Sequence, residues 1–505
     1  MQIAGKNSLQ IATWNIAAIN NNPFEYWITY DEEPAYEKLM INVEQFLENP
    51  GDRDVSVDQV FTSSMFDQLE KRLTETAGWP SVREYWESDF SKRKIVSGFM
   101  KDGTLGKKRL ASMPDRVTNT IHTADGKTVF RPTVINMYEG DLGTQDGWWA
   151  EWEKFMFDTE LLMAQSSGTT ESKKPFAMLQ PIKRSKYKDV TEEEERDSLQ
   201  LQTLCGAIFD AILVHMMNTL ADSPQQWQAL KMTMVENLNK MKIPHTLDIL
   251  QKQYTGSDII TLQEVSSMFV DRARELPLAK TYHIISPADA DSARDQNSVI
   301  FLKRSRFDGP GKEITSQLTA PLPEGTVAPG DLLVVEVKDT AGTTYRIASF
   351  HGDTNGLATV PVTEAVIAGL PSSHKLIFGL DANTYEHGDE KKKDVLEYEK
   401  MFRSNSLLSC WGEKVNPANY TTYNARTFLQ PQLNKACRQS EKRAKGDVNP
   451  KDFILFRESD FTVSKTWKDN TGERKYVENV AFPTLQFPSD HGILATVLQD
   501  KRQDI

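Results

Sequence analysis

The sequence predicts an α+β protein in which a strand-rich core is interrupted by a long, mainly helical insertion. Short apolar runs rich in β-branched residues begin at residue 9 and recur from residue 258 to residue 498, each bounded by turn residues. Helical patterns between some of these runs favour sheets and helices packed as layers. After the first run, strand patterns fade and amphipathic helical patterns dominate until the runs resume. We therefore predict one domain formed by residues 1–24 and 247–505, with residues 25–246 as the insertion.

The individual elements follow from the same patterns. Residues 359–370 are predicted to form a helix, and the acidic run at 192–195 is predicted to begin a solvent-exposed one. Seven of the ten tryptophans fall in the insertion, which suggests a tryptophan-rich surface that binds a partner protein. The predicted strands occupy residues 9–16, 258–265, 282–286, 297–304, 332–339, 345–352, 375–381, 451–456 and 491–498.

Composition and charge exclude several classes of protein. Of the 505 residues, 39% are hydrophobic and 26% are charged, so the chain is neither a disordered nor a fibrous sequence. Its formal charge of −12 excludes a chain that is basic throughout, although it leaves room for a local basic groove. Three scattered cysteines are too few for a disulfide framework or a zinc site, which indicates a reducing, intracellular compartment, either cytoplasmic or nuclear. The amino terminus shows no apolar segment typical of a signal peptide.

The longest apolar run, at residues 204–221, is predicted to be a helix buried in a protein core. It carries Asp210, His215 and Asn218, whose insertion into hydrocarbon would be costly. We therefore expect no membrane span.

Polar residues stand where the predicted strands begin or end. An aspartate or asparagine beside a strand is usually only a turn former. Here, however, such groups recur at six strand boundaries, and a series of this kind is hard to explain as separate turns. The groups are Asn15, Glu264, His351 with Asp353 and Asn355, Asp381 with Asn383, Asp452, and Asp490 with His491.

The order and local sequence of these groups resemble the endonuclease/exonuclease/phosphatase (DNase I-like) superfamily. The successive steps between the motifs from Glu264 to Asp490 are 87, 30, 71 and 38 residues. The resemblance covers residues 1 to about 20 and about 247 to 505, and it implies a four-layer α/β/β/α sandwich. The chain departs from the family in one respect, because Asn15 and Glu264 are 249 residues apart where the family usually has a few tens.

The resemblance also implies a metal-dependent phosphoester hydrolase. Glu264 would be the principal metal ligand, with Asn15 and Asp490 nearby, and oxygen ligands without thiolates favour Mg²⁺ or Mn²⁺. Asp381 and Asn383 would position the attacking water and hold the charge that develops on the phosphoryl group.

The same resemblance assigns roles to the two histidines. His491, oriented by Asp452, would act as acid, base or phosphate ligand, and His351 would contact the scissile phosphate. Which group accepts the proton of the water stays open. Asn355 is either a turn former or a substrate-binding residue.

The substrate is less constrained. Basic segments at 91–116, 173–188 and 426–451 favour a phosphate-rich ligand such as single-stranded nucleic acid, with Lys183 and Arg184 as candidate substrate-binding residues. A phosphodiesterase or nuclease is therefore the leading interpretation. The alternatives are a phosphomonoesterase acting on an inositol phosphate, a nucleotide or another small phosphorylated compound, and a non-catalytic scaffold, which the complete set of motif residues disfavours. The insertion would be a lid or substrate platform, or a module that binds a partner protein.

Overall fold

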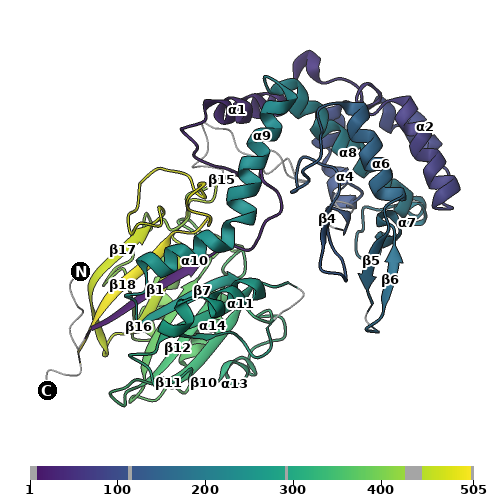
Figure 1. The fold of residues 1–505 in the computed structure, drawn as a ribbon. Coiled ribbons are helices and arrows are strands. Elements are labelled where there is room, and N and C mark those ends of the chain that lie inside the picture. The colour runs from purple at the N-terminus through teal and green to yellow at the C-terminus, as the bar shows by residue number, and fades with distance from the viewer. Residues whose placement is uncertain (1–7, 112–116, 166, 291–293, 427–445, 502–505) are drawn as a thin grey trace. The chain divides into compact units, whose positions relative to one another are not determined.

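The computed structural model describes residues 8–111, 117–165, 167–290, 294–426 and 446–501. These residues form two compact units (Figure 1). Unit 1 comprises the described residues within 8–19, 240–425 and 446–501, and unit 2 comprises those within 20–239 together with Arg426. Each unit is described by itself below.

The first sheet of unit 1 has six strands, with the amino-terminal strand near its centre. The strands are β1 (Ser8–Asn15), β7 (Ile259–Val265), β8 (Tyr282–Ile285), β9 (Asn297–Lys303), β17 (Phe461–Asp469) and β18 (Ile493–Asp500). Their order is β17-β18-β1-β7-β9-β8, so that β1 lies between β18 and β7 (Figure 1). β1 runs antiparallel to β18 and parallel to β7, which places Asn15 opposite Gln263.

The second sheet also has six strands. They are β10 (Lys312–Glu313), β11 (Leu332–Lys338), β12 (Thr344–His351), β13 (Lys375–Asp381), β14 (Leu407–Ser409) and β16 (Asp452–Arg457). Their order is β10-β11-β12-β13-β16-β14. β12 and β13 are parallel, with His351 opposite Asp381, and β16 is antiparallel to β13, with Asp452 opposite Asp381.

An apolar core joins the two sheets face to face. It includes Ile11 of the first sheet and Ile347 and Ile377 of the second, each fully buried. The sheets approach closely at Gly379 of β13, where an added Cβ would clash with the Thr261 side chain of β7. A glycine is therefore required two residues before Asp381, the aspartate that ends this strand.

Helices cover the outer face of each sheet. The first sheet packs through a second apolar cluster, which includes Leu250 and Phe269, against α10 (Lys242–Gln253), α11 (Ser267–Glu275) and α12 (Leu278–Thr281). The second sheet packs through a third cluster, which includes Val362 and Tyr398, against α13 (Thr315–Thr319), α14 (Thr359–Ile367) and α15 (Val395–Ser404). Unit 1 is thus a four-layer α/β/β/α sandwich, which confirms the predicted fold class.

Unit 2 is mainly helical, with two small hairpins. The acidic run at 192–195 begins a helix, as predicted, and Thr191 and Glu194 close its first turn as a capping box. The helices are α1 (Pro34–Glu48), α2 (Ser63–Lys71), α3 (Arg83–Ser88), α4 (Gly103–Lys108), α6 (Gln145–Phe157), α7 (Glu192–Arg196), α8 (Ser198–Leu220) and α9 (Pro224–Met234). The hairpins pair β3 (Thr120–His122) with β4 (Thr128–Phe130) and β5 (Leu161–Ala164) with β6 (Thr170–Lys173).

The apolar run at 204–221 forms most of α8, the core helix of unit 2. Within the described residues it is the one helix long and apolar enough to cross a membrane, but 83% of its apolar window is buried inside the structure. Its Asp210 carboxylate accepts hydrogen bonds from Arg131 Nε at 2.7 Å, Thr133 Oγ1 at 2.6 Å and Trp152 Nε1 at 2.9 Å. These hydrogen bonds stabilise the buried carboxylate of Asp210 in the core.

Six of the seven tryptophans of unit 2 belong to its core and Trp79 is half-buried, so the expected tryptophan-rich surface is wrong. Trp86 stacks on Phe66 with ring centroids 4.6 Å apart, and Trp149 stacks on Trp152 at 5.5 Å. Aromatic rings bury large apolar areas, which explains their concentration inside this unit. The tryptophans exposed by 4% or less are Trp27, Trp86, Trp148, Trp149, Trp152 and Trp227.

The two described cysteines are free thiols. Cys205 and Cys410 are buried and form no disulfide. Burial raises the pKa of each of these thiols to about 12, so neither is a reactive thiolate. Cys437 and most of the basic segment at 426–451 lie outside the described residues.

Candidate active site

The predicted motif residues meet at strand ends of both sheets. Asn15 ends β1, and Glu264 lies one residue before the end of β7, its parallel neighbour. His351 and Asp381 end the parallel strands β12 and β13. Parallel strands end on the same side of a sheet. Asn15 and Glu264 therefore lie together at the ends of two strands of the first sheet, and His351 and Asp381 lie together at the ends of two strands of the second.

The Asn15 side chain is hydrogen-bonded to Glu264 of the first sheet and to Asp381 of the second. Its Nδ2 donates to Glu264 Oε1 at 2.9 Å and to Asp381 Oδ2 at 2.9 Å. Its Oδ1 accepts from the Ala17 N–H at 2.9 Å, which fixes the orientation of this fully buried amide. Asn15 therefore presents nitrogen rather than oxygen to the carboxylates, and binding a cation through its oxygen would require the amide to turn over.

His491 and Asp452 form a buried pair beside Asp381. His491 Nδ1 lies 2.9 Å from Asp452 Oδ2, and His491 Nε2 lies 3.6 Å from Asp381 Oδ2. The His491 N–H donates to Ser489 Oγ at 3.0 Å, which holds the backbone of the closing motif. The structure thus places the Asp452 carboxylate where the sequence predicted that it would orient this imidazole.

A second imidazole approaches Asp381 from β12. His351 Nε2 lies 3.3 Å from Glu264 Oε1 and 3.9 Å from Asp381 Oδ2. His351 Nδ1 lies 3.6 Å from Asp331 Oδ1, and Asp331 is paired in turn with Arg294, whose NH1 lies 3.1 Å from Asp331 Oδ2. The sequence analysis missed Asp331 and Arg294.

The surrounding carboxylates set the charge of both imidazoles. Burial alone would lower the pKa of His351, but Glu264 and Asp331 raise it from 6.5 to about 9. Burial likewise acts against protonation of His491, but Asp452 holds its pKa well above the usual value. Both rings are therefore protonated at neutral pH and suited to face anionic oxygens.

Glu264 is held as an ionised carboxylate. Burial would raise its pKa, but His351, Asn15 and the Ala18 N–H, which donates to Oε2 at 2.8 Å, lower it from 4.5 to about 2. Its backbone φ of 56° lies in the left-handed region, which is uncommon for a residue with a side chain. Residues held in this region often lie at functional sites, because the surrounding structure must maintain them there.

Asn383 is fixed by contacts on both sides of its amide. Its Nδ2 donates to the Gly352 carbonyl at 2.8 Å, and its Oδ1 accepts from Lys451 Nζ at 2.8 Å. Its backbone N–H donates to Asp381 Oδ1 at 2.9 Å. Lys451 is a further residue that the sequence analysis missed, although it directly precedes Asp452.

Asp490 lies in the segment that closes the site against β1. The neighbouring Ser489 Oγ donates to the Asn15 carbonyl at 2.6 Å. Lys242, buried on the first turn of α10, also lies nearby. Burial lowers the pKa of its ammonium to about 8, and the charges of Asp490 and Glu264 partly offset this. Asp490 therefore contributes negative charge on the Glu264 side of the site.

The turn after β12 contains Asp353 and Asn355. The Asp353 carboxylate accepts from the N–H groups of Asn355 at 3.2 Å and Ala358 at 2.7 Å, as a turn-forming aspartate does. The Asn355 carbonyl accepts from the Lys393 N–H at 2.9 Å. A role for the Asn355 side chain in substrate binding stays a prediction.

Lys183 and Arg184 are exposed residues of unit 2. Arg184 NH1 lies 3.7 Å from Glu192 Oε2, so part of its charge is neutralised. Close by in sequence, Tyr187 hydrogen-bonds Arg109, which joins the basic segments at 91–116 and 173–188. At this contact, the described residues of the two segments, 91–111 and 173–188, are neighbours within unit 2.

The residues around Asp381 suit a divalent cation. Possible ligand atoms of Asp381, Asp452 and His491 all lie within 4.8 Å of one another. Asp452 Oδ1 is buried and has no hydrogen-bond partner in the part of the chain that the structure describes. A buried carboxylate oxygen in this state is expected to contact an ion or water. The donor set therefore fits a metal-dependent reaction.

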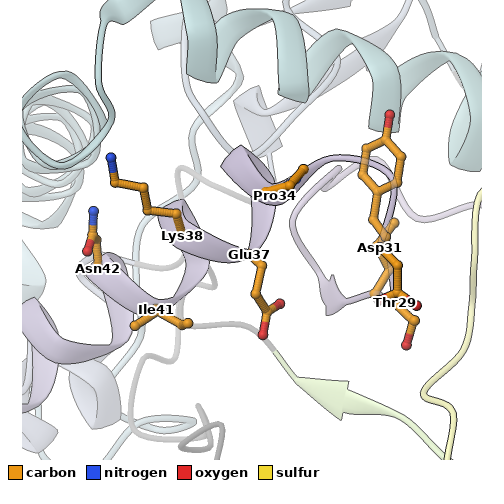
Figure 2. Close-up of a pocket in the computed structure, with 9 residues that line it drawn as sticks. Thr29, Asp31, Pro34, Glu37, Lys38, Ile41 and Asn42 are labelled. Atoms are coloured by element: carbon orange, nitrogen blue, oxygen red, sulfur yellow. The ribbon is translucent and has the colours of Figure 1, made fainter.

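A separate hollow of about 570 Å³ lies in unit 2, beside the first turns of α1 (Figure 2). Lys38 Nζ in its lining lies 2.5 Å from Asp222 Oδ1, and the Glu37 carboxylate accepts from Trp27 Nε1 at 2.8 Å. Lys38 and Glu37 are therefore paired, and the described residues that line the hollow form no catalytic cluster. The hollow is lined by Ile28, Thr29, Tyr30, Asp31, Pro34, Glu37, Lys38, Ile41 and Asn42.

With its two facing sheets, its outer helices and this cluster at the strand ends, unit 1 has a DNase I-like fold. Solved structures similar to the chain include a humanized D. rerio TDP2 carrying 14 mutations, with 16% identity over 52% of this chain and 96% of that one and a TM-score of 0.33. The catalytic domain of human Nocturnin with bound sulfate has 17% identity over 53% and 89% of the two chains and a TM-score of 0.35. An endonuclease/exonuclease/phosphatase from Beutenbergia cavernae DSM 12333 has 16% identity over 51% and 66% and a TM-score of 0.34.

The insertion has a separate similarity. Residues 54–232 match a family described as a domain of unknown function (DUF8234). No curated protein sequence matches the chain.

Proposed function

We propose that unit 1 is a divalent-cation-dependent phosphodiesterase of the nuclease type. One observation carries the proposal: Asp381 Oδ2 lies 2.9 Å from Asn15 Nδ2, 3.6 Å from His491 Nε2 and 3.9 Å from His351 Nε2. Hydrolysis of a phosphoester requires a positioned water, a proton acceptor and positive charge facing the phosphoryl oxygens. A buried carboxylate flanked by two imidazolium groups supports all three requirements.

The cluster of Asp381, Asp452 and His491 is the less suitable position for a cation, because His491 is protonated and paired with Asp452. We place the cation, Mg²⁺ or Mn²⁺, at Glu264 with Asp490 beside it. Both offer hard oxygen donors, and Glu264 is ionised at neutral pH because its pKa is about 2. When bound, the cation would neutralise charge on the phosphoryl oxygens. Asn15 holds the Glu264 and Asp381 carboxylates at a fixed separation through the two hydrogen bonds of its Nδ2.

The remaining side chains act on the phosphoryl group and on the water. His351 and the Asn383 Nδ2 are donors suited to the oxygens of the scissile phosphate. Asp452 holds His491 through Nδ1, which leaves Nε2 to face the reaction. Asp381 is the group placed to accept the proton of the water, because His491 is already protonated at neutral pH.

We propose single-stranded nucleic acid as the substrate class and an intracellular, cytoplasmic or nuclear, location. The basic segments at 91–116 and 173–188 support a polyanionic ligand, because exposed lysines and arginines attract phosphates. In this proposal the catalytic domain comprises residues 1–24 and 247–505, and the insertion at residues 25–246 binds the substrate strand, with Lys183 and Arg184 among its contacts.

An activity panel tests the reaction and the substrate together. Purified chain with Mg²⁺ is incubated with single-stranded DNA and RNA, duplex DNA, inositol phosphates and 4-nitrophenyl phosphate. We expect cleavage of single strands. Hydrolysis of the monoesters alone would instead establish the phosphomonoesterase alternative, and an inert protein would favour the scaffold.

A further inference from the structure

The buried ammonium of Lys451 contacts the amide of Asn383. Lys451 is 4% exposed, and its Nζ lies 2.8 Å from Asn383 Oδ1 and 2.6 Å from Asp447 Oδ2. The same Nζ lies 5.4 Å from the centroid of the Tyr385 ring. A buried ammonium is costly unless it is paired, and Asp447 supplies the compensating charge. The same Nζ donates a second hydrogen bond, to the amide oxygen of Asn383.

This contact fixes which way the Asn383 amide points. An ammonium group can only donate, so Lys451 requires the amide oxygen on its side. The Gly352 carbonyl can only accept, so it requires the amide nitrogen on the other side, at 2.8 Å. The two contacts agree, and an inverted amide would break both of them.

The orientation leaves Asn383 with a donor directed at the reaction site. One Nδ2–H is used by the Gly352 carbonyl, and Nδ2 lies 3.4 Å from Asp381 Oδ2, a weak contact that a substrate oxygen can replace. Hydrogen bonding of an ammonium to the amide oxygen also polarises the amide, which strengthens its N–H groups as donors.

The backbone ties the same groups together. The Ala382 N–H donates to the Lys451 carbonyl at 2.8 Å, so the chain before β16 is paired with the turn that holds Asn383. The Lys451 N–H donates to Thr421 Oγ1 at 3.0 Å. Asn383 itself has a φ of 49°, in the left-handed region, and therefore depends on its neighbours to hold its conformation.

We propose that Lys451, anchored by Asp447, is a positioning residue that holds and polarises the Asn383 amide for contact with the phosphoryl group. It does not touch the substrate. The expected loss of kcat rests on the proposed phosphoester hydrolysis. The expected effect of Lys451 on the orientation of the Asn383 amide rests on the structure alone.

The kinetic test compares Lys451→Met with a matched buried lysine. Lys375 is also 4% exposed and is paired with Asp500, but it begins β13, at the opposite end of the strand from Asp381. With bis(4-nitrophenyl) phosphate and Mg²⁺, Lys451→Met should lower kcat about 10- to 100-fold with little change in KM, because a transition-state donor is weakened. Lys375→Met should lose stability in thermal unfolding but keep kcat within about 2-fold. Equal kcat losses in the two variants would overturn the proposal.

A double-mutant cycle separates positioning from general stabilisation. If Lys451 acts through Asn383, then Lys451→Met should cost less than about 3-fold in kcat in an Asn383→Ala background. Additive losses would show that Lys451 acts elsewhere. If the Lys451→Met protein does not fold, the double variant Lys451→Met with Asp447→Leu replaces it in the cycle, because this variant removes both buried charges.

A crystal structure of the Lys451→Met protein tests the amide without any catalysis. We expect the Asn383 Nδ2 to leave the Gly352 carbonyl or the amide to invert. An unchanged amide would overturn the inference. If the wild-type chain hydrolyses none of the phosphoesters, the proposed function fails, while this comparison still decides whether Lys451 positions Asn383.

Discussion

Single side chains near the strand ends carry the proposed chemistry, and Asn383 and His491 are the two whose loss is easiest to interpret. Each is held by defined partners, the Gly352 carbonyl for Asn383 and Asp452 for His491. Truncation to alanine removes a donor to the transition state, which typically costs ~10²-fold or more in rate. We expect Asn383→Ala and His491→Ala each to lower kcat by at least this factor, with folding checked by circular dichroism. Near-normal turnover in either variant would remove that residue from the mechanism.

A substitution of Glu264 tests the proposed cation site. Glu264→Gln keeps the shape of the side chain but removes the ionised carboxylate that His351 and Asn15 stabilise. We expect it to weaken Mg²⁺ binding in isothermal titration calorimetry and to remove most activity, while the thermal unfolding midpoint of the chain in EDTA changes little. Glu324→Gln, at an exposed position of the same unit, is the matched control and should leave Mg²⁺ binding unchanged, because it removes the same charge away from the strand ends.

The elements show how much the sequence could predict. The run at 375–381 is a strand with the predicted bounds, since a fully apolar run that ends in a turn is a clear signal. β17 was missed, because this strand at the edge of its sheet carries exposed polar residues such as Lys465 and does not form an apolar run. Strand prediction therefore depended on an apolar run. The edge strand β8, which has one, was predicted at 282–286, and the edge strand β17, which has none, was not.

The same reasoning explains which site residues were missed. The motif residues were found because they follow or open recognisable strands. Asp331 precedes β11, and only the antiparallel pairing of β11 with β12 brings it next to His351, whose N–H donates to the Asp331 carbonyl at 2.9 Å. Lys451 reaches Asn383 in the same way, through the antiparallel pairing of β13 with β16. Such neighbours depend on tertiary pairing, which local sequence does not reveal.

Helix α9 of unit 2 provides a pH-dependent prediction. Burial lowers the pKa of Lys231 from 10.5 to about 7, and its Nζ donates to the carbonyls of Thr133 at 3.1 Å and Tyr138 at 2.7 Å. Between pH 7 and 10.5 the unfolded chain then binds more protons than the folded one, so stability rises with pH in this window.

We therefore expect the free energy of unfolding of unit 2 to increase by about 2 kcal/mol from pH 7 to pH 9, and this increase to disappear in Lys231→Met. Urea titrations at the two pH values measure it. Lys38→Met, which removes an exposed lysine paired with Asp222, should keep the wild-type slope. A slope that Lys231→Met leaves unchanged would show that another group titrates.

At the scale of the whole molecule, the two units are proposed to act on one substrate. Neutralising Lys183, Arg184, Lys186 and Lys188 to glutamine should raise KM for a single-stranded oligonucleotide and flatten the dependence of KM on salt, because screened phosphate contacts contribute mainly to binding. Hydrolysis of bis(4-nitrophenyl) phosphate, which carries a single phosphate, should be almost unchanged.

The matched control removes as many charges from exposed lysines of unit 2 outside the basic segments. These are Lys38, Lys71, Lys127 and Lys154. We expect this variant to keep the wild-type KM and salt slope. If the two variants behave alike, the basic segment at 173–188 does not bind substrate, and unit 2 is better interpreted as a module for a partner protein.

The central claim is that the strand-end cluster of unit 1 hydrolyses phosphodiesters with the help of a divalent cation. The most direct measurement compares cleavage of a single-stranded oligonucleotide by the wild-type chain and by Asp381→Asn, each in Mg²⁺, in excess EDTA, and in EDTA followed by excess Mg²⁺. We predict cleavage by the wild type in Mg²⁺, none in EDTA, recovery when Mg²⁺ is restored, and no cleavage by Asp381→Asn under any of these conditions. Undiminished cleavage in EDTA, or equal cleavage by both proteins, would contradict the account.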